Sequence, residues 1–153
     1  MDSKLKFPIS TNTLQAGLPH RPPMVWVRSV IFADEMGGIC EAMLEPGSHE
    51  FGEHTLRQSS LLEWMVQGYG FAQHCVTGRV PQQVFLAQAQ NIEFCSKTLW
   101  DEFTMKAMQG TRAFIEGRLV RQLGEMVMIQ SKVVWDCPQK FLLASGQFKL
   151  YQT

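Results

Sequence analysis

The sequence lacks the cysteine and charge patterns that mark several large classes of protein. Its four cysteines are widely spread, without a C-x-x-C pair or a Cys/His cluster. We therefore expect reduced thiols that act as small apolar residues, and neither a metal site nor a cofactor. The 14 basic and 14 acidic residues balance, and no run of like charge occurs. This balance argues against a nucleic-acid or anionic-membrane binder, although it leaves room for a local basic patch that meets an acidic partner.

Long hydrophobic segments are missing as well. No stretch approaches the roughly 18 apolar residues that span a bilayer, and no apolar signal-peptide region follows the N-terminus. We therefore expect a cytoplasmic protein. Only 18% of the residues are charged, while there are nine methionines and ten phenylalanines. This composition predicts extra apolar surface that a second copy of the chain would cover.

One long helix is predicted, over about 58–77. Apolar residues recur there at helical spacing, and Gly78 is a suitable C-terminal stop. Gly68 and Gly70 lie inside the apolar stripe. Each costs about 1 kcal/mol relative to Ala in a helix, so their presence predicts the close approach of another backbone.

The rest of the chain predicts strands. Turn formers fill residues 1–23, and Gly37-Gly38 is expected to be the turn of the first hairpin. The expected strands are 24–32, 39–44, 83–94, 101–109, 112–123, 125–136 and 146–152, with further hairpin turns at 109–111 and 123–125. The chain of 153 residues is most simply a single domain, 1–153. One helix beside antiparallel strands packs most economically with the sheet curled around it. The predicted class is therefore α+β with the hotdog fold, which is commonly dimeric through edge-to-edge sheets.

Three separated segments carry residues of chemical interest in a fixed order. Leu18–Pro23 (LPHRPP) precedes an apolar strand, His49 and Gly52 lie in a loop, and Glu63–Gln67 (EWMVQ) lies on the helix. In this order they resemble the L-P-H-R-x-P, H-F-P-G and E-A-M-A-Q segments of the 3-hydroxyacyl-carrier-protein dehydratases of bacterial type II fatty-acid synthesis. The gap of fourteen positions between the histidine and the glutamate is the same in that family.

The resemblance implies dehydration of a 3-hydroxyacyl thioester carried by an acidic acyl carrier protein. The neutral imidazole of His49 would remove the C2 proton, and Glu63, kept partly protonated by burial, would protonate the leaving C3 hydroxyl. Backbone N–H groups near Gly52 and at the helix N-terminus would stabilise charge on the thioester oxygen. Phe51 and Gly52 would contact substrate, and Gln67, one turn after Glu63, would orient that carboxyl group. In the family the two catalytic residues of one site come from opposite subunits, so the resemblance implies a homodimer.

The loop around the histidine departs from the family. Residues 49–58 (HEFGEHTLRQ) keep the His and one Gly of H-F-P-G-x-P-x-x-P-G but lack its three prolines. In this the chain is similar to the divergent dehydratase-like proteins of aryl-polyene and related polyketide pathways. Two other functions therefore stay open. One is a non-catalytic acyl-binding or scaffold partner of an active dehydratase, and the other is a hotdog thioesterase whose helix carboxylate activates water.

Both catalytic residues have alternatives. His54 is a rival base in the same loop. Glu63 could instead be the last residue of a Ser60-x-x-Glu63 capping box. The rival box, Thr55-x-x-Gln58, starts the helix earlier, and we favour it because the family's helix begins there.

The remaining polar residues have simpler interpretations. We expect His20 to hold the opening segment, His74 to interact with the helix C-terminus, and Asp101 to cap a turn. A basic patch for the carrier protein is expected from Arg57, Arg79 and Lys97.

Overall fold

The structure, a computed structural model, describes residues 5–10, 27–44, 57–78 and 84–152. Its strands are β1 (Ile9–Ser10), β2 (Ser29–Asp34), β3 (Gly37–Leu44), β4 (Val84–Phe94), β5 (Thr111–Leu123), β6 (Met126–Trp135) and β7 (Leu142–Gln152). The helices are α2 (Ser60–Thr77) and α3 (Lys97–Gln109). None of the helices in these ranges combines the length and the apolar character needed to cross a membrane.

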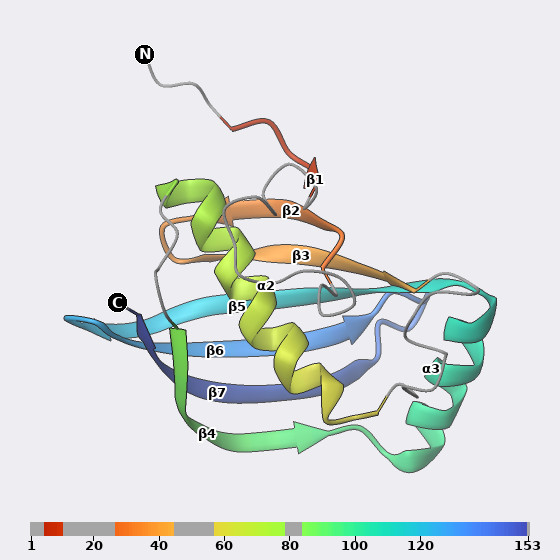
Figure 1. The fold of residues 1–153 in the computed structure, drawn as a ribbon. Coiled ribbons are helices and arrows are strands. Elements are labelled where there is room, and N and C mark those ends of the chain that lie inside the picture. Colours follow the sequence, from red (N-terminus) through yellow and green to blue (C-terminus); the bar gives the residue numbers. More distant parts are fainter. Residues whose placement is uncertain (1–4, 11–26, 45–56, 79–83, 153) are drawn as a thin grey trace.

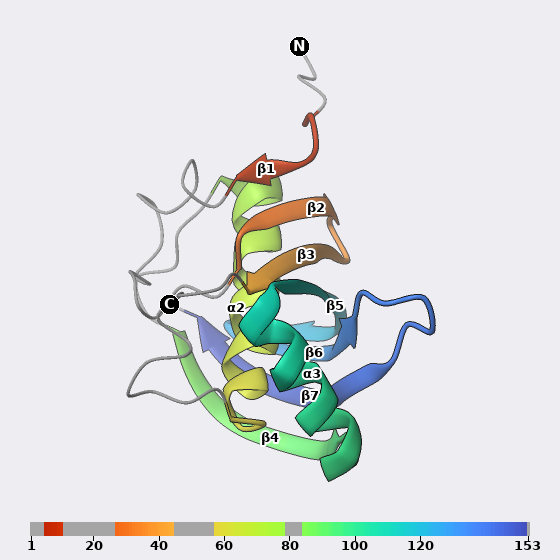
Figure 2. The same ribbon diagram turned by 90° about the vertical axis from the view of Figure 1, so that its right-hand side faces the viewer.

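The seven strands form one antiparallel sheet in the order β1-β2-β3-β5-β6-β7-β4. The sheet curves around α2, which lies across one face and contacts β2, β3, β5 and β6 (Figures 1 and 2). The shorter α3 covers the end of the sheet at which β5 begins (Figure 1). This arrangement of one long central helix in a curved antiparallel sheet is the hotdog fold, which confirms the predicted class.

Small residues on the sheet let α2 pack closely. A Cβ atom at Gly38 would lie 2.7 Å from Cβ of Ala72, and one at Gly117 would lie 3.3 Å from Cβ of Tyr69. On the helix, a Cβ atom at Gly68 would lie 2.7 Å from Cγ2 of Ile115. A methyl group at Gly38 or Gly68 would clash with these atoms, and one at Gly117 would be tightly packed, so the glycines permit the close approach of helix and sheet.

The two helix glycines differ. The close neighbour of Gly68 is the side chain of Ile115 and not another backbone, so the prediction of close approach is right but its partner is different. For Gly70 the prediction is wrong, because no described atom lies within 4 Å of a Cβ atom built there.

Two predicted chain reversals are confirmed. Gly78 ends α2 in a left-handed conformation with φ 63°, and its N–H donates to the carbonyl of His74 at 2.9 Å. Gly124, with φ 58°, joins β5 to β6 in a tight hairpin in which Leu123 pairs with Met126.

The predicted turn at Gly37-Gly38 is wrong, because both glycines belong to β3. The chain reverses at residues 35–36, where Oδ1 of Asp34 accepts a hydrogen bond from the N–H of Met36 at 2.8 Å. Gly37 is needed for a different reason: a Cβ atom there would lie 2.0 Å from the carbonyl oxygen of Gly117 on β5. The described part of the first hairpin strand is β2, which extends two residues beyond the predicted end at residue 32.

The predicted strand at 101–109 is also wrong, because this segment is α3. Trp100, Phe103 and Ala107 recur at helical spacing and form its buried face. The residues that suggested alternation lie on different faces of the helix: Phe103 is buried, whereas Met105 and Met108 are exposed on the opposite face. Residues 109–111 consequently connect a helix to a strand and do not form a hairpin.

Residues near the start of α3 explain why it begins there. The Oγ atom of Ser96, the N-cap residue, accepts a hydrogen bond from the N–H of Leu99 at 3.2 Å. Asp101 lies within the helix and forms an ion pair with Lys97 at 2.8 Å, so the expectation that it caps a turn is wrong.

Strand β4 forms one edge of the sheet, pairs with β7, and packs one of its side chains over a glycine of β7. A Cβ atom at Gly146 of β7 would lie 2.3 Å from Cδ1 of Ile92 of β4. The isoleucine thus occupies the space that any larger residue at position 146 would need. The observed bounds of β4, β5 and β6 each agree with the predicted ones to within one residue.

Candidate functional site

The described part of the candidate site lies at the N-terminal end of α2. Glu63 is in the first turn of the helix and is half-buried. An acidic side chain at this position is favourable for the helix itself, because it meets the positive end of the helix dipole. The position therefore suits a structural role as well as a chemical one.

The helix begins later than we favoured. Its N-cap residue is Ser59, which makes no side-chain capping hydrogen bond, and Ser60 is the first helical residue. The Oγ atom of Ser60 lies 3.4 Å from the N–H of Arg57, which donates to it. The helix start at Ser60 contradicts the preferred Thr55 box, and the N-cap at Ser59 also contradicts the box that began at Ser60.

A non-local hydrogen bond fixes the approach to this first turn. The side-chain amide of Gln58 donates to the carbonyl oxygen of Cys95 at 3.1 Å. Cys95 directly follows the last residue of β4. The turn that positions Glu63 is therefore tied to the end of the edge strand, which no pattern in the sequence predicts.

Gln67, one turn after Glu63, is almost completely buried, with 2% of its surface exposed. Its Oε1 atom accepts a hydrogen bond from the backbone N–H of Val27 at 3.2 Å. Since burial of an unsatisfied amide is costly, this bond accounts for a glutamine in the core. It also joins α2 to the chain just after the LPHRPP segment, a role that we did not predict.

The other predicted site residues lie outside the described residues. His49, Phe51, Gly52 and the rival base His54 belong to residues 45–56, which connect β3 to α2. His20 and Arg79 are also outside the described ranges. His74 lies in the last turn of α2, as expected for favourable interaction with the helix dipole.

Strand β4 presents an open edge beside this end of the helix. Among the described strands it pairs only with β7. Phe85, Leu86 and Phe94 are 55%, 52% and 41% exposed, and Glu93 is the only charged residue of the strand. Bulges are among the features that block pairing at an edge strand, and β4 has irregular register between Leu86 and Gln88 and between Gln90 and Glu93. The strand nevertheless has one charged residue and three exposed apolar side chains, which are typical of an edge that a second chain covers.

Three of the four cysteines have thiols whose pKa values are raised by burial. All four are free thiols. Burial raises the pKa of Cys40, whose Sγ donates to the carbonyl oxygen of Gly68 at 3.2 Å. Burial also raises the pKa of Cys75 to about 11 and, more weakly, that of Cys95. These three thiols are therefore protonated near neutral pH, and a thiolate mechanism at them is disfavoured.

The predicted basic patch is only partly described. Lys97 forms its ion pair with Asp101, while Arg57 is exposed. Among the described residues, no group of three or more His, Cys, Asp or Glu side chains is arranged to hold a metal ion.

Comparisons with known proteins place the chain by its fold. No protein-family model matches the sequence, and no curated protein matches it. Solved structures do match. A chain of the dehydratase heterocomplex ApeI:P from Xenorhabdus doucetiae has a TM-score of 0.66 at 16% identity, over 97% of this chain and 93% of that chain.

Other similar structures include one bound to acetyl-CoA and one named as a hypothetical thioesterase. A Streptococcus mutans protein bound to acetyl-CoA has a TM-score of 0.55 at 14% identity, over 81% of this chain and 86% of its own. A hypothetical thioesterase from Streptococcus pneumoniae has a TM-score of 0.56 at 10% identity, over 81% and 88%. Identities this low show the fold alone. The chain is a hotdog-fold protein, and the proteins it resembles include both a dehydratase and a thioesterase.

Proposed function

We propose that this protein dehydrates 3-hydroxyacyl thioesters to trans-2-enoyl thioesters, with Glu63 and His49 as its catalytic residues. The observation that carries the proposal is the position of Glu63, half-buried in the first turn of the central helix. It lies one turn before the buried Gln67 and fourteen positions after His49. The dehydratase heterocomplex that shares the fold supports the same reaction class.

The reaction needs one base and one acid. His49 takes the proton from C2, and the electron pair forms the C2–C3 double bond as the C3–O bond breaks. Glu63 donates its proton to the departing hydroxyl, which leaves as water. Negative charge that develops on the thioester oxygen is stabilised by N–H groups at the N-terminus of α2.

The open edge of β4 supports a dimer as the active form. Two copies joined along this edge would cover Leu86 and Phe94 and extend the sheet across both subunits. In such a dimer each site takes His49 from one subunit and Glu63 from the other. We propose an acyl carrier protein as the donor of the substrate, on the pattern of the dehydratases that the sequence resembles.

The proposal is tested by following one 3-hydroxyacyl-pantetheine thioester in the purified protein, with separate detection of enoyl product and of free thiol. We expect enoyl product, and a fall in rate of about 10²–10⁴-fold in His49→Ala and in Glu63→Gln. His54→Ala is the matched control in the same loop and is expected to keep activity. Unchanged turnover in His49→Ala refutes that base, and loss in His54→Ala alone assigns the base to His54. Release of free thiol without enoyl product would show a thioesterase instead.

A second function is favoured by two findings. The match to a chain of a dehydratase heterocomplex spans 97% of this chain, and the loop of His49 lacks three prolines of the dehydratase pattern. The chain would then be the non-catalytic partner of an active dehydratase. An inert homodimer, together with co-purification with a second hotdog subunit that restores turnover, would establish this alternative.

A further inference from the structure

The face of the sheet opposite α2, here the outer face, follows from the strand register. Ile115 packs against Gly68 of α2, and its cross-strand partner Val133 therefore faces the helix as well. Along β6 the side chains alternate, so Val127 and Ile129 also face the helix and are buried. Met126 and Met128, which alternate with these two residues, point to the outer face.

One end of the outer face carries an apolar row across four neighbouring strands. Leu123 of β5 pairs with Met126 of β6, which pairs with Tyr151 of β7, which pairs with Phe85 of β4. Leu123, Tyr151 and Phe85 are 51%, 42% and 55% exposed. Scattered exposed apolar residues are ordinary, but four in register on adjacent strands form a continuous patch.

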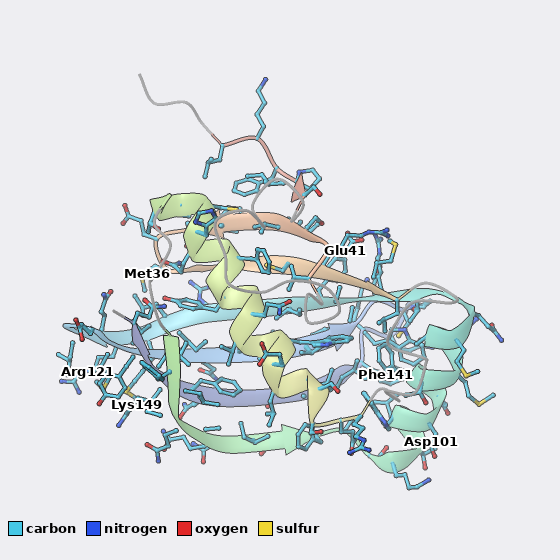
Figure 3. All side chains as sticks on the ribbon, viewed as in Figure 1. Met36, Glu41, Asp101, Arg121, Phe141 and Lys149 are labelled. Carbon is cyan, nitrogen blue, oxygen red and sulfur yellow. The ribbon has the colours of Figure 1, made fainter. Side chains whose placement is uncertain are left out.

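The next row along the same strands is basic. Arg121 of β5 pairs with Met128, which pairs with Lys149 of β7. Figure 3 shows Arg121 and Lys149 close to the same end of the sheet. Neither cation forms an ion pair with any residue in the described ranges. Their charge is therefore available to a binding partner.

We propose that this apolar–basic surface (Leu123, Met126, Tyr151, Phe85, Arg121 and Lys149) docks an acidic, amphipathic helix of the acyl carrier protein. The inference rests on the proposed function, from which the acidic partner follows. The chemistry matches in both parts, because an apolar stripe of such a helix would cover the exposed row while its carboxylates meet the two unpaired cations.

The position of the surface agrees with the site that it would serve. Phe85 lies near the start of β4, whereas the end of β4 leads to Cys95, which is bonded to Gln58 before α2. Two β4 edges related by a two-fold axis run antiparallel, so the start of one lies beside the end of the other. The surface of one subunit is then at the end of the dimer that holds Glu63 of the partner subunit.

The test compares the same 3-hydroxyacyl group on a holo acyl carrier protein and on free pantetheine. In the variant Arg121→Glu/Lys149→Glu we expect KM for the carrier-bound substrate to rise at least tenfold, and kcat/KM for the pantetheine substrate to stay within twofold. Leu123→Ser is expected to change KM in the same direction. The control is Lys106→Glu, which makes the same charge reversal at another exposed cation, on α3.

Direct binding separates this inference from the proposed function. Titration of labelled holo carrier protein, followed by fluorescence anisotropy, should show weaker binding in the double variant and increasing dissociation with salt, even if the chain proves to lack dehydratase activity. Equal binding by wild type and variant would overturn the inference. A changed oligomeric state of the double variant in light scattering would overturn the inference in favour of a second copy of the chain. If the variant loses only its binding to vesicles that contain phosphatidylglycerol, the inference is overturned in favour of a membrane surface.

Discussion

The two ends of the outer face hold similar cations in opposite circumstances. At the end covered by α3, Arg112 donates from Nε to Asp136 at 2.5 Å and lies 3.9 Å from Glu41, and Lys140 contacts Asp136 as well. At the other end Arg121 and Lys149 have no such partners among the described residues. The labelled residues of Figure 3 mark the two ends. Charges that are neutralised within the fold contribute to its stability, and charges left unpaired are available for recognition.

The apolar residues divide in the same way. Beneath α3, Phe103 is fully buried and lies 5.5 Å from Trp100 and 5.6 Å from Trp135, measured between ring centroids. At the end of the sheet where Leu123 lies, no described helix covers the aromatic rings, and Tyr151 and Phe85 are about half exposed. One end therefore stabilises the domain, while the other keeps apolar area that none of the described residues covers.

The largest effect is expected at the covered end. Phe103→Ala should lower the free energy of unfolding by about 3–5 kcal/mol, because it leaves a cavity between two tryptophan rings. Met105→Ala, two residues along the same helix and 67% exposed, is the control and should change stability by less than about 0.5 kcal/mol. Urea denaturation measures both. Similar losses in the two variants would show that α3 does not divide into a buried and an exposed face as described.

A smaller effect is expected when the same charge is reversed at each end. Arg112→Glu places a carboxylate beside Asp136 and Glu41, and should cost about 1–2 kcal/mol. Arg121→Glu removes no ion pair and should change stability by less than about 0.5 kcal/mol. Equal melting temperatures for the two variants would show that the ion pairs of Arg112 do not make its end of the outer face different from the end that holds Arg121.

The smallest effect depends on pH. Hydrogen bonds from Lys140 and Arg112 hold the pKa of Asp136 below its ordinary value. A carboxyl group with a lowered folded-state pKa adds stability above its unfolded-state pKa of about 3.9, and this stability is lost as the pH falls through the folded-state value. Asp136→Asn should therefore cost about 1 kcal/mol at neutral pH, with the exposed partners limiting the loss. The difference from wild type should shrink below about pH 4. A constant difference down to pH 2 would contradict this linkage.

Local signals predicted most of the elements. The helical stripe that ends at Gly78 and the hairpin at Gly124 depend on residues close in sequence, and both are confirmed. The helix α3 was missed because Phe103, Met105 and Met108 suggest alternation until the packing of Phe103 on Trp135 is known. Tertiary contacts decided the structure of that segment.

Only part of the candidate site was predicted, because its other contacts join residues that are far apart in the sequence. The motif places Glu63 and Gln67 on the helix, where both are found. The contacts that hold this end, from Gln58 to Cys95 and from Val27 to Gln67, join residues 37 and 40 positions apart. No local pattern encodes such pairs. The loop of His49 lies outside the described residues, and its role stays a prediction.

The hydrogen bond from Gln58 to Cys95 has a mechanical consequence for assembly. Cys95 directly follows β4, and Gln58 lies two residues before α2, so this bond joins the end of the edge strand to the segment that leads into the helix. In the dimer that we propose, pairing along β4 would therefore also act on the position of Glu63.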